Sequence, residues 1–104
     1  MRLTYLLPLF FINIVFTSSI SGTIRDKETG EPLPYTNIMI EGTSIGTASD
    51  INGYYIIPSI DTGVYVLKIM MIGYAEIEED VIIKDINLRL NLELQPQMID
   101  IDEI

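Results

Sequence analysis

The sequence contains no cysteine, no histidine and no tryptophan among its 104 residues. Without cysteine, no disulfide can stabilise the fold and no thiol is available for lipid attachment. The lack of both histidine and cysteine excludes Ser–His and Cys–His nucleophilic pairs, and it leaves carboxylates as the only common zinc ligands. These residues therefore cannot build a zinc peptidase or a Ser–His hydrolase.

Positive charge is also scarce, because 6 Lys and Arg residues stand against 15 Asp and Glu residues, for a net charge of −9. Nucleic acids and anionic lipid surfaces are bound by patches of Lys and Arg. We therefore expect no nucleic-acid partner, and we expect the acidic surface to keep the domain monomeric.

The first 19 residues have the three parts of a secretory signal peptide. Arg2 is followed by a largely apolar run over 3–16 and by small residues over 17–19. The run is short for a bilayer-spanning helix, and Pro8 and Asn13 interrupt it. We predict a signal peptide over 1–19, one domain over 20–95 and the start of a linker over 96–104; an uncleaved anchor or a buried N-terminal segment is the alternative for the first part.

The predicted domain consists of short β runs separated by turns, with no helical period. The clearest run covers 88–94, where four leucines alternate with polar residues, which indicates a strand with one buried and one exposed face. About seven such runs predict an all-β fold, a seven-stranded antiparallel Greek-key sandwich of the prealbumin-like or Ig-like kind. Alternation places the following residues in the core: Ile24, Ile38, Ile40, Ala48, Tyr55, Ile57, Tyr65, Leu67, Ile69, Leu90 and Leu92.

Asp50-Ile51-Asn52-Gly53 predicts a tight hairpin turn, because Asp and Asn bond nearby backbone N–H groups and Gly accepts positive φ. A calcium loop of the EF-hand type would need an oxygen ligand at its fifth position and a Glu at its twelfth, and these are Tyr54 and Asp61. We therefore favour a turn over a metal site. The acidic run over 76–80 is interpreted in the same way, as a solvated surface.

We expect no catalytic, cofactor-binding or metal-binding residue. Ser44, Ser49 and Ser59 lie in turn-like sequence with no base beside them. Tyr54 and Tyr74 are the candidate exposed contact residues. Tyr54 and its neighbour Tyr55 must point to opposite faces of a strand, so Tyr54 is free to stack on a sugar or a partner. Cross-strand packing is the other interpretation of both tyrosines.

The order of several short motifs resembles the carboxypeptidase-like regulatory domain family. They are Gly22 and Asp26, the loop 30–34, Asn37-Ile38, Glu41-Gly42-Thr43, Gly46-Thr47, Asp50, Asn52-Gly53, Tyr55, Gly63, Tyr65, Leu67 and Ile72-Gly73-Tyr74. The resemblance implies a prealbumin-like sandwich that is not itself a peptidase. Behind a signal peptide, it is similar to the N-terminal extension of TonB-dependent outer-membrane receptors, and Met98 to Ile104 is similar to the hydrophobic–acidic segment that follows such a domain.

The resemblance therefore implies a non-enzymatic accessory domain of a nutrient-transport receptor, located in the periplasm or at the outer membrane. Its partners would be other receptor domains, envelope proteins or carbohydrate, with no cofactor. Two alternatives stay open. One is a free-standing secreted module that binds carbohydrate or protein, and the other is the regulatory domain of a secreted carboxypeptidase-type hydrolase.

Overall fold

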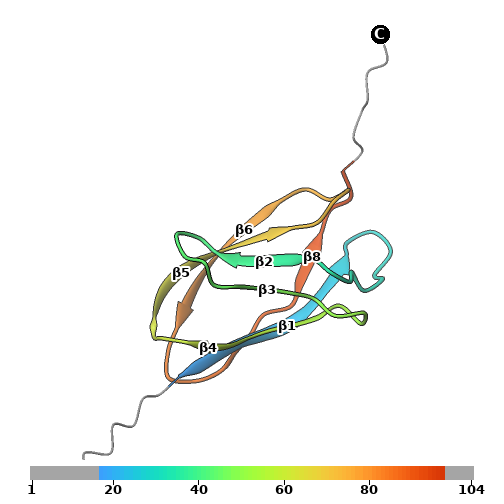
Figure 1. Cartoon of the computed structure of the whole chain (residues 1–104). Coiled ribbons are helices and arrows are strands. Elements are labelled where there is room, and N and C mark those ends of the chain that lie inside the picture. The colour runs from blue at the N-terminus through green and yellow to red at the C-terminus, as the bar shows by residue number, and fades with distance from the viewer. Residues whose placement is uncertain (1–16, 98–104) are drawn as a thin grey trace, which may run out of the picture.

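Apolar alternation along the chain produces two β-sheets that pack face to face (Figure 1). The computed structural model describes residues 17–97, so most of the predicted signal peptide and the segment 98–104 lie outside the described residues. No helix within 17–97 is long and apolar enough to cross a membrane.

The first sheet is centred on β1 (Ser18–Asp26), the longest strand. Every second residue of β1 is buried, which gives the sheet a dry inner face. On one side β1 pairs with β4 (Tyr54–Ile60), which is antiparallel to it. On the other side it pairs with β7 (Leu88–Arg89) and β8 (Leu92–Leu94).

The second sheet is antiparallel throughout and has the order β3-β2-β5-β6. Its strands are β3 (Gly46–Ala48), β2 (Asn37–Ile40), β5 (Gly63–Met70) and β6 (Ile77–Ile83). The edge strand β6 carries Glu78 and Asp80 on its exposed face. Such charges keep an open sheet edge from pairing with other chains.

The predicted strand over 88–94 is present, but it differs from the prediction in two ways. It is divided into β7 and β8, so the described residues contain eight strands rather than seven. Both pieces run parallel to β1, with Leu88 opposite Ile20 and Leu92 opposite Ile24, so the first sheet is mixed rather than antiparallel. Alternation shows which face of a strand is buried, but it carries no information on the direction of the neighbouring strand.

The turn at Asp50 to Gly53 forms as predicted, but it does not close a hairpin. The N–H of Gly53 donates to the Asp50 carbonyl at 2.9 Å, and the N–H of Asp50 donates to the Tyr54 carbonyl at 2.7 Å. The strands on either side belong to different sheets, since β3 pairs with β2 and β4 pairs with β1. The turn is therefore a corner at which the chain crosses from one sheet to the other.

The core lies between the sheets and takes residues from both. Most of the predicted core residues are buried: Ile24, Ile38, Ile40, Tyr55, Ile57, Leu67, Ile69 and Leu92. Tyr65 and Leu90 are half-buried and pack against this cluster. Ala48 was wrongly placed, because it is exposed and the next residue, Ser49, is buried in its stead. The Ser49 hydroxyl is satisfied there, donating to the Leu33 carbonyl at 2.7 Å and accepting the Thr36 N–H at 2.8 Å.

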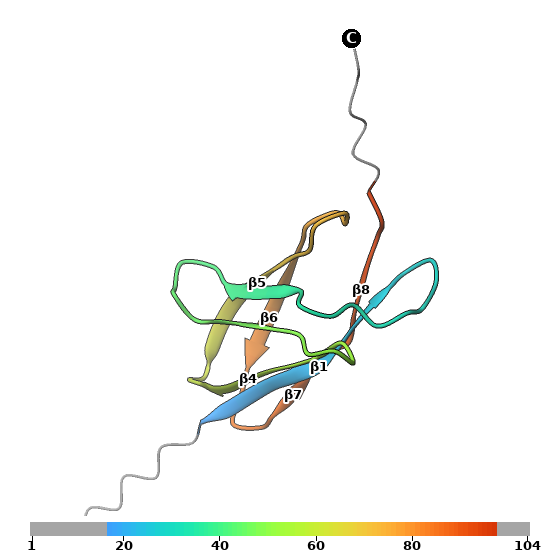
Figure 2. The same cartoon turned by 45° about the vertical axis from the view of Figure 1, so that its right-hand side comes forward.

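The described chain starts and finishes at opposite ends of the sandwich (Figure 2). At one end, which we call the Ser18 pole, Ser18 lies opposite Ile60 and its hydroxyl donates to the Lys84 carbonyl. At the other, the Gln97 pole, the N–H of Gln97 donates to the Gly73 carbonyl at 2.9 Å. This separation follows from the parallel pairing of β8 with β1, because both strands point toward the Gln97 pole.

Candidate functional site

An apolar groove of about 550 Å³ opens at the Gln97 pole, where β2 begins and β5 ends. Glu76 is the one charged residue in its lining, and Lys68 holds that carboxylate at 3.5 Å. We call it the Tyr35 groove, and its lining residues are Pro34, Tyr35, Asn37, Met70, Met71, Ile72, Tyr74 and Glu76. Methionine side chains adapt to differently shaped apolar partners, so this surface is suited to protein contact.

Two residues of the groove have exposed side chains and lie at or next to backbone with positive φ. Tyr35 has a φ of 59°, in the left-handed region that a bulky side chain rarely adopts. Its N–H donates to the Ser49 carbonyl at 2.9 Å, and its side chain is 66% exposed. Ile72 is 91% exposed and precedes Gly73, which has a φ of 88°. The groove therefore presents two exposed apolar side chains, and the backbone is strained at Tyr35.

Tyr74 connects the groove to the loop that follows β1. Its hydroxyl donates to Asp26 Oδ2 at 2.7 Å, while Asp26 Oδ1 accepts the N–H groups of Glu28 at 2.7 Å and Thr29 at 3.0 Å. The Tyr74 hydrogen bond is the largest cause that lowers the pKa of Asp26, and the same bond raises the pKa of Tyr74. Tyr74 was expected to be exposed, but it is half-buried and its hydroxyl is occupied, so only its ring faces the groove.

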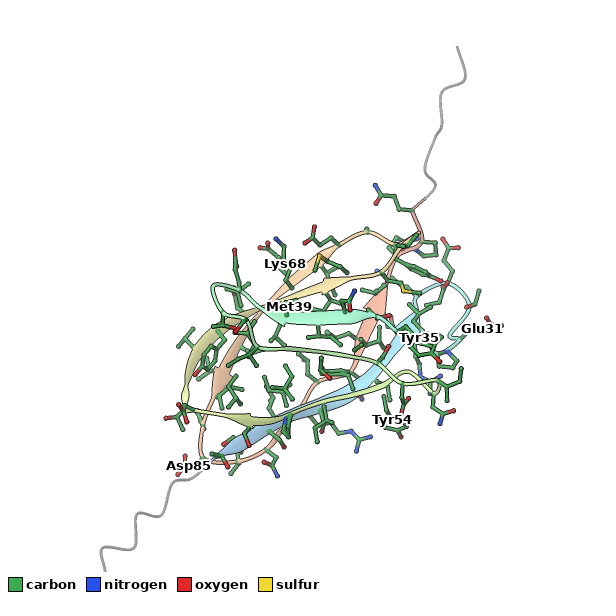
Figure 3. All side chains as sticks on the ribbon, viewed as in Figure 1. Glu31, Tyr35, Met39, Tyr54, Lys68 and Asp85 are labelled. Carbon is green, nitrogen blue, oxygen red and sulfur yellow. The ribbon has the colours of Figure 1, made fainter. Side chains whose placement is uncertain are left out.

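Tyr54 lies on a separate surface, the outer face of the first sheet. Figure 3 shows it on the opposite side of the sandwich from Lys68. Its side chain is 52% exposed, and its strand partner is Thr23 on β1. The structure therefore does not bring Tyr54 and Tyr74 together, and a contact role for either residue stays a prediction.

The residues weighed for metal binding serve the backbone instead. Asp50 Oδ1 accepts the N–H of Asn52 at 2.8 Å and the N–H of Tyr54 at 3.0 Å, as an Asx-type turn requires. Gly53 has a φ of 79°, in the region that glycine accepts most readily. Within residues 17–97, no group of three or more Asp and Glu residues is arranged to hold a metal ion.

Sequence reasoning missed the Tyr35 groove, because its lining comes from segments far apart in the chain. One signal was present in the run Met70-Met71-Ile72, where apolar residues continue past the last alternating position of β5. A second was Tyr35 after Pro34, since a large aromatic residue directly after proline in a loop has no strand to pack on.

The described residues form two packed sheets with no helix, which defines a small all-β sandwich. The chain belongs to the CarboxypepD_reg-like domain family, whose sequence model matches residues 20–104. The resemblance inferred from the motifs is thereby confirmed.

Individual relatives agree with this assignment. The TonB-dependent receptor P3 of Formosa agariphila is 38% identical over 56 residues, which are 54% of this chain and 6% of the receptor. The chain therefore spans only a small part of that relative. A type II cohesin–X-dockerin complex from Acetivibrio cellulolyticus contains a chain of similar structure, with a TM-score of 0.62 and 26% identity over 72% of this chain and 52% of that one.

The 5-hydroxyisourate hydrolase of Klebsiella pneumoniae has the same fold. Its TM-score is 0.60, with 18% identity over 78% of this chain and 92% of the hydrolase. At that identity the likeness extends to the fold alone, and no catalytic residue is transferred from it.

Proposed function

We propose that this chain is a non-enzymatic accessory domain of a TonB-dependent outer-membrane receptor, exported and facing the periplasm as the N-terminal extension of the receptor. The observation that carries the proposal is the family match over 20–104 together with the similarity to a receptor of this class. The domain acts through contacts with other parts of the receptor or with envelope proteins.

The Tyr35 groove supports a contact role at a defined place. It lies at the Gln97 pole, beside the last described residue, so whatever follows residue 97 in the chain begins next to this apolar groove. Tyr35 and Ile72 together expose a large apolar area there, and patches of this kind mark interaction sites in otherwise polar proteins. The domain would therefore meet a neighbour at this pole.

Photo-crosslinking in living cells tests the proposal. A photoreactive residue at position 72 reports on the groove, and one at position 85 is the control, because Asp85 is also exposed but lies at the Ser18 pole, next to Lys84 (Figure 3). We expect position 72 to crosslink to an envelope protein or within a receptor polypeptide, and position 85 to crosslink far less. Equal crosslinking from both positions would contradict a contact role for the groove.

A free-standing secreted module is the second candidate, and one observation favours it. The chain is 26% identical to a chain of a type II cohesin–X-dockerin complex, which is a protein–protein assembly. In that case the domain would be found in the culture medium, as a short polypeptide, rather than in the envelope.

A further inference from the structure

The outer face of the first sheet presents an ordered grid of side chains around Tyr54, which we call the Tyr54 face. Tyr55 and Ile57 point into the core, so Tyr54 and Ile56 point outward. Strand register places Tyr54 beside Thr23, and it places Ile56 and Arg89 on either side of Ser21. Asn91 completes the grid through its contact with Thr23.

Asn91 is fixed in position by β1. Its Oδ1 accepts the backbone N–H of Thr23 at 3.1 Å and the Thr23 hydroxyl at 3.2 Å. The oxygen takes the place of a ladder carbonyl at the break between β7 and β8. With that oxygen occupied, the side-chain amide still has its two N–H donors to offer to a ligand.

Arg89 supplies a positive charge on this face of an otherwise acidic protein. It is exposed, and in the described part of the chain the single ion pair within 4.0 Å is Lys68–Glu76, on the other sheet. Arg25 and Glu93 stand opposite each other further along β1 without an ion pair within 4.0 Å, and the Arg25 guanidinium donates to the Gly30 carbonyl at 3.0 Å. Arg25 and Arg89 against Glu93 leave the outer face of these strands with one net positive charge.

These groups are spaced for an extended ligand. Tyr54 and Arg89 lie on strands on opposite sides of β1, and their β1 partners, Thr23 and Ser21, are two residues apart. Ordinary strand spacings therefore separate the backbones of Tyr54 and Arg89 by about 12 Å. That span accommodates two linked pyranose rings, and the side chains of Tyr54 and Arg89 are long enough to contact both rings. An exposed aromatic ring, a fixed amide donor and a guanidinium provide stacking, hydrogen bonding and charge pairing respectively.

We propose that the Tyr54 face binds an acidic glycan. One sugar ring stacks on Tyr54, hydroxyl groups accept hydrogen bonds from the Asn91 amide, and a carboxylate or sulfate on a neighbouring ring pairs with Arg89. The proposal does not depend on the receptor assignment, because the face exists in the domain whether or not a receptor carries it.

Calorimetric titration of the purified chain with defined tetrasaccharides tests the proposal. Tetragalacturonate carries carboxylates, a carrageenan tetrasaccharide carries sulfates alone, and cellotetraose is neutral. We expect at least one acidic probe to bind, cellotetraose to bind at least tenfold more weakly, and the acidic affinity to fall as salt is raised. The acidic probe that binds more tightly identifies the anionic group.

Five variants assign the binding to the face. Tyr54→Ala and Arg89→Gln should each weaken the acidic probe about tenfold or more, whereas Tyr54→Phe should retain binding because the ring remains. Tyr35→Ala and Lys84→Gln, which remove a tyrosine and a positive charge elsewhere on the surface, should change nothing. Binding of no acidic probe, binding indifferent to Tyr54→Ala and Arg89→Gln, or equal binding of cellotetraose would overturn the proposal.

Discussion

The Tyr55 hydroxyl donates a hydrogen bond to the Leu90 carbonyl at 2.5 Å and reaches it across Gly22 of the intervening strand. A Cβ at position 22 would lie 1.9 Å from the Leu90 oxygen, so a glycine is required there. The bond holds β4 to the break between β7 and β8, where the regular ladder is interrupted.

Gly22→Ala should therefore be severely destabilising, by about 2–4 kcal/mol in the free energy of unfolding, because backbone atoms rather than a flexible side chain must move. Urea denaturation monitored by circular dichroism measures the effect. Gly30→Ala is the matched control: Gly30 has a φ of 75° and no atom within 4 Å of the new Cβ, so only the left-handed backbone is penalised, by about 1 kcal/mol. Equal losses in the two variants would show that the close approach at Gly22 is not needed.

Alkaline pH should weaken the fold through Tyr55. Burial raises the pKa of Tyr55 from 10.0 to about 12. Between these values the unfolded chain releases the phenolic proton while the folded chain keeps it, so the stability that is fully present below pH 10 is lost as pH rises toward 12. Urea midpoints between pH 8 and 11.5 should fall, and should fall less steeply in Tyr55→Phe. An unchanged slope in that variant would argue against burial of the hydroxyl.

Acid pH should act through the Asp26–Tyr74 pair. The pKa of Asp26 is held below its usual 3.8, chiefly by the Tyr74 hydroxyl. The unfolded carboxyl therefore takes up a proton first, and the stability present above about pH 3.8 is lost as pH falls through the lower folded pKa. Melting temperatures between pH 2 and 6 should depend less on pH in Tyr74→Phe than in the parent chain. Tyr54→Phe, on the other surface, should leave the profile of the parent unchanged.

The sheet-crossing corner should depend on Gly53. A Cβ there would meet the Ile24 carbonyl oxygen at 2.7 Å, in addition to the penalty for a φ of 79°. We expect Gly53→Ala to cost about 2–3 kcal/mol. Gly42→Ala has the same kind of backbone, with a φ of 78° but open space around it, and should cost about 1 kcal/mol. If chemical denaturation gave the two variants the same midpoint, the corner would be looser than the structure indicates.

The sequence predicted what depends on local alternation and failed where distant segments meet. Leu92 and Leu67 are buried as the period of two requires, and the Asp50 turn forms from its own side chain. The parallel pairing of β8 with β1 was missed, because alternation is the same in either strand direction. The Asp26–Tyr74 bond joins residues 48 positions apart, and no local pattern reports such a contact.

The most direct measurement for the receptor proposal is the size and location of the native polypeptide that carries residues 20–97. An antibody raised against the domain would be used on separated outer-membrane, periplasmic and medium fractions of the producing cells. We expect the signal in the outer membrane, on a polypeptide far longer than 104 residues, with the domain protected from protease in whole cells and cleaved once the periplasm is opened. A short polypeptide found mainly in the medium would contradict the receptor proposal and favour the free-standing binding module.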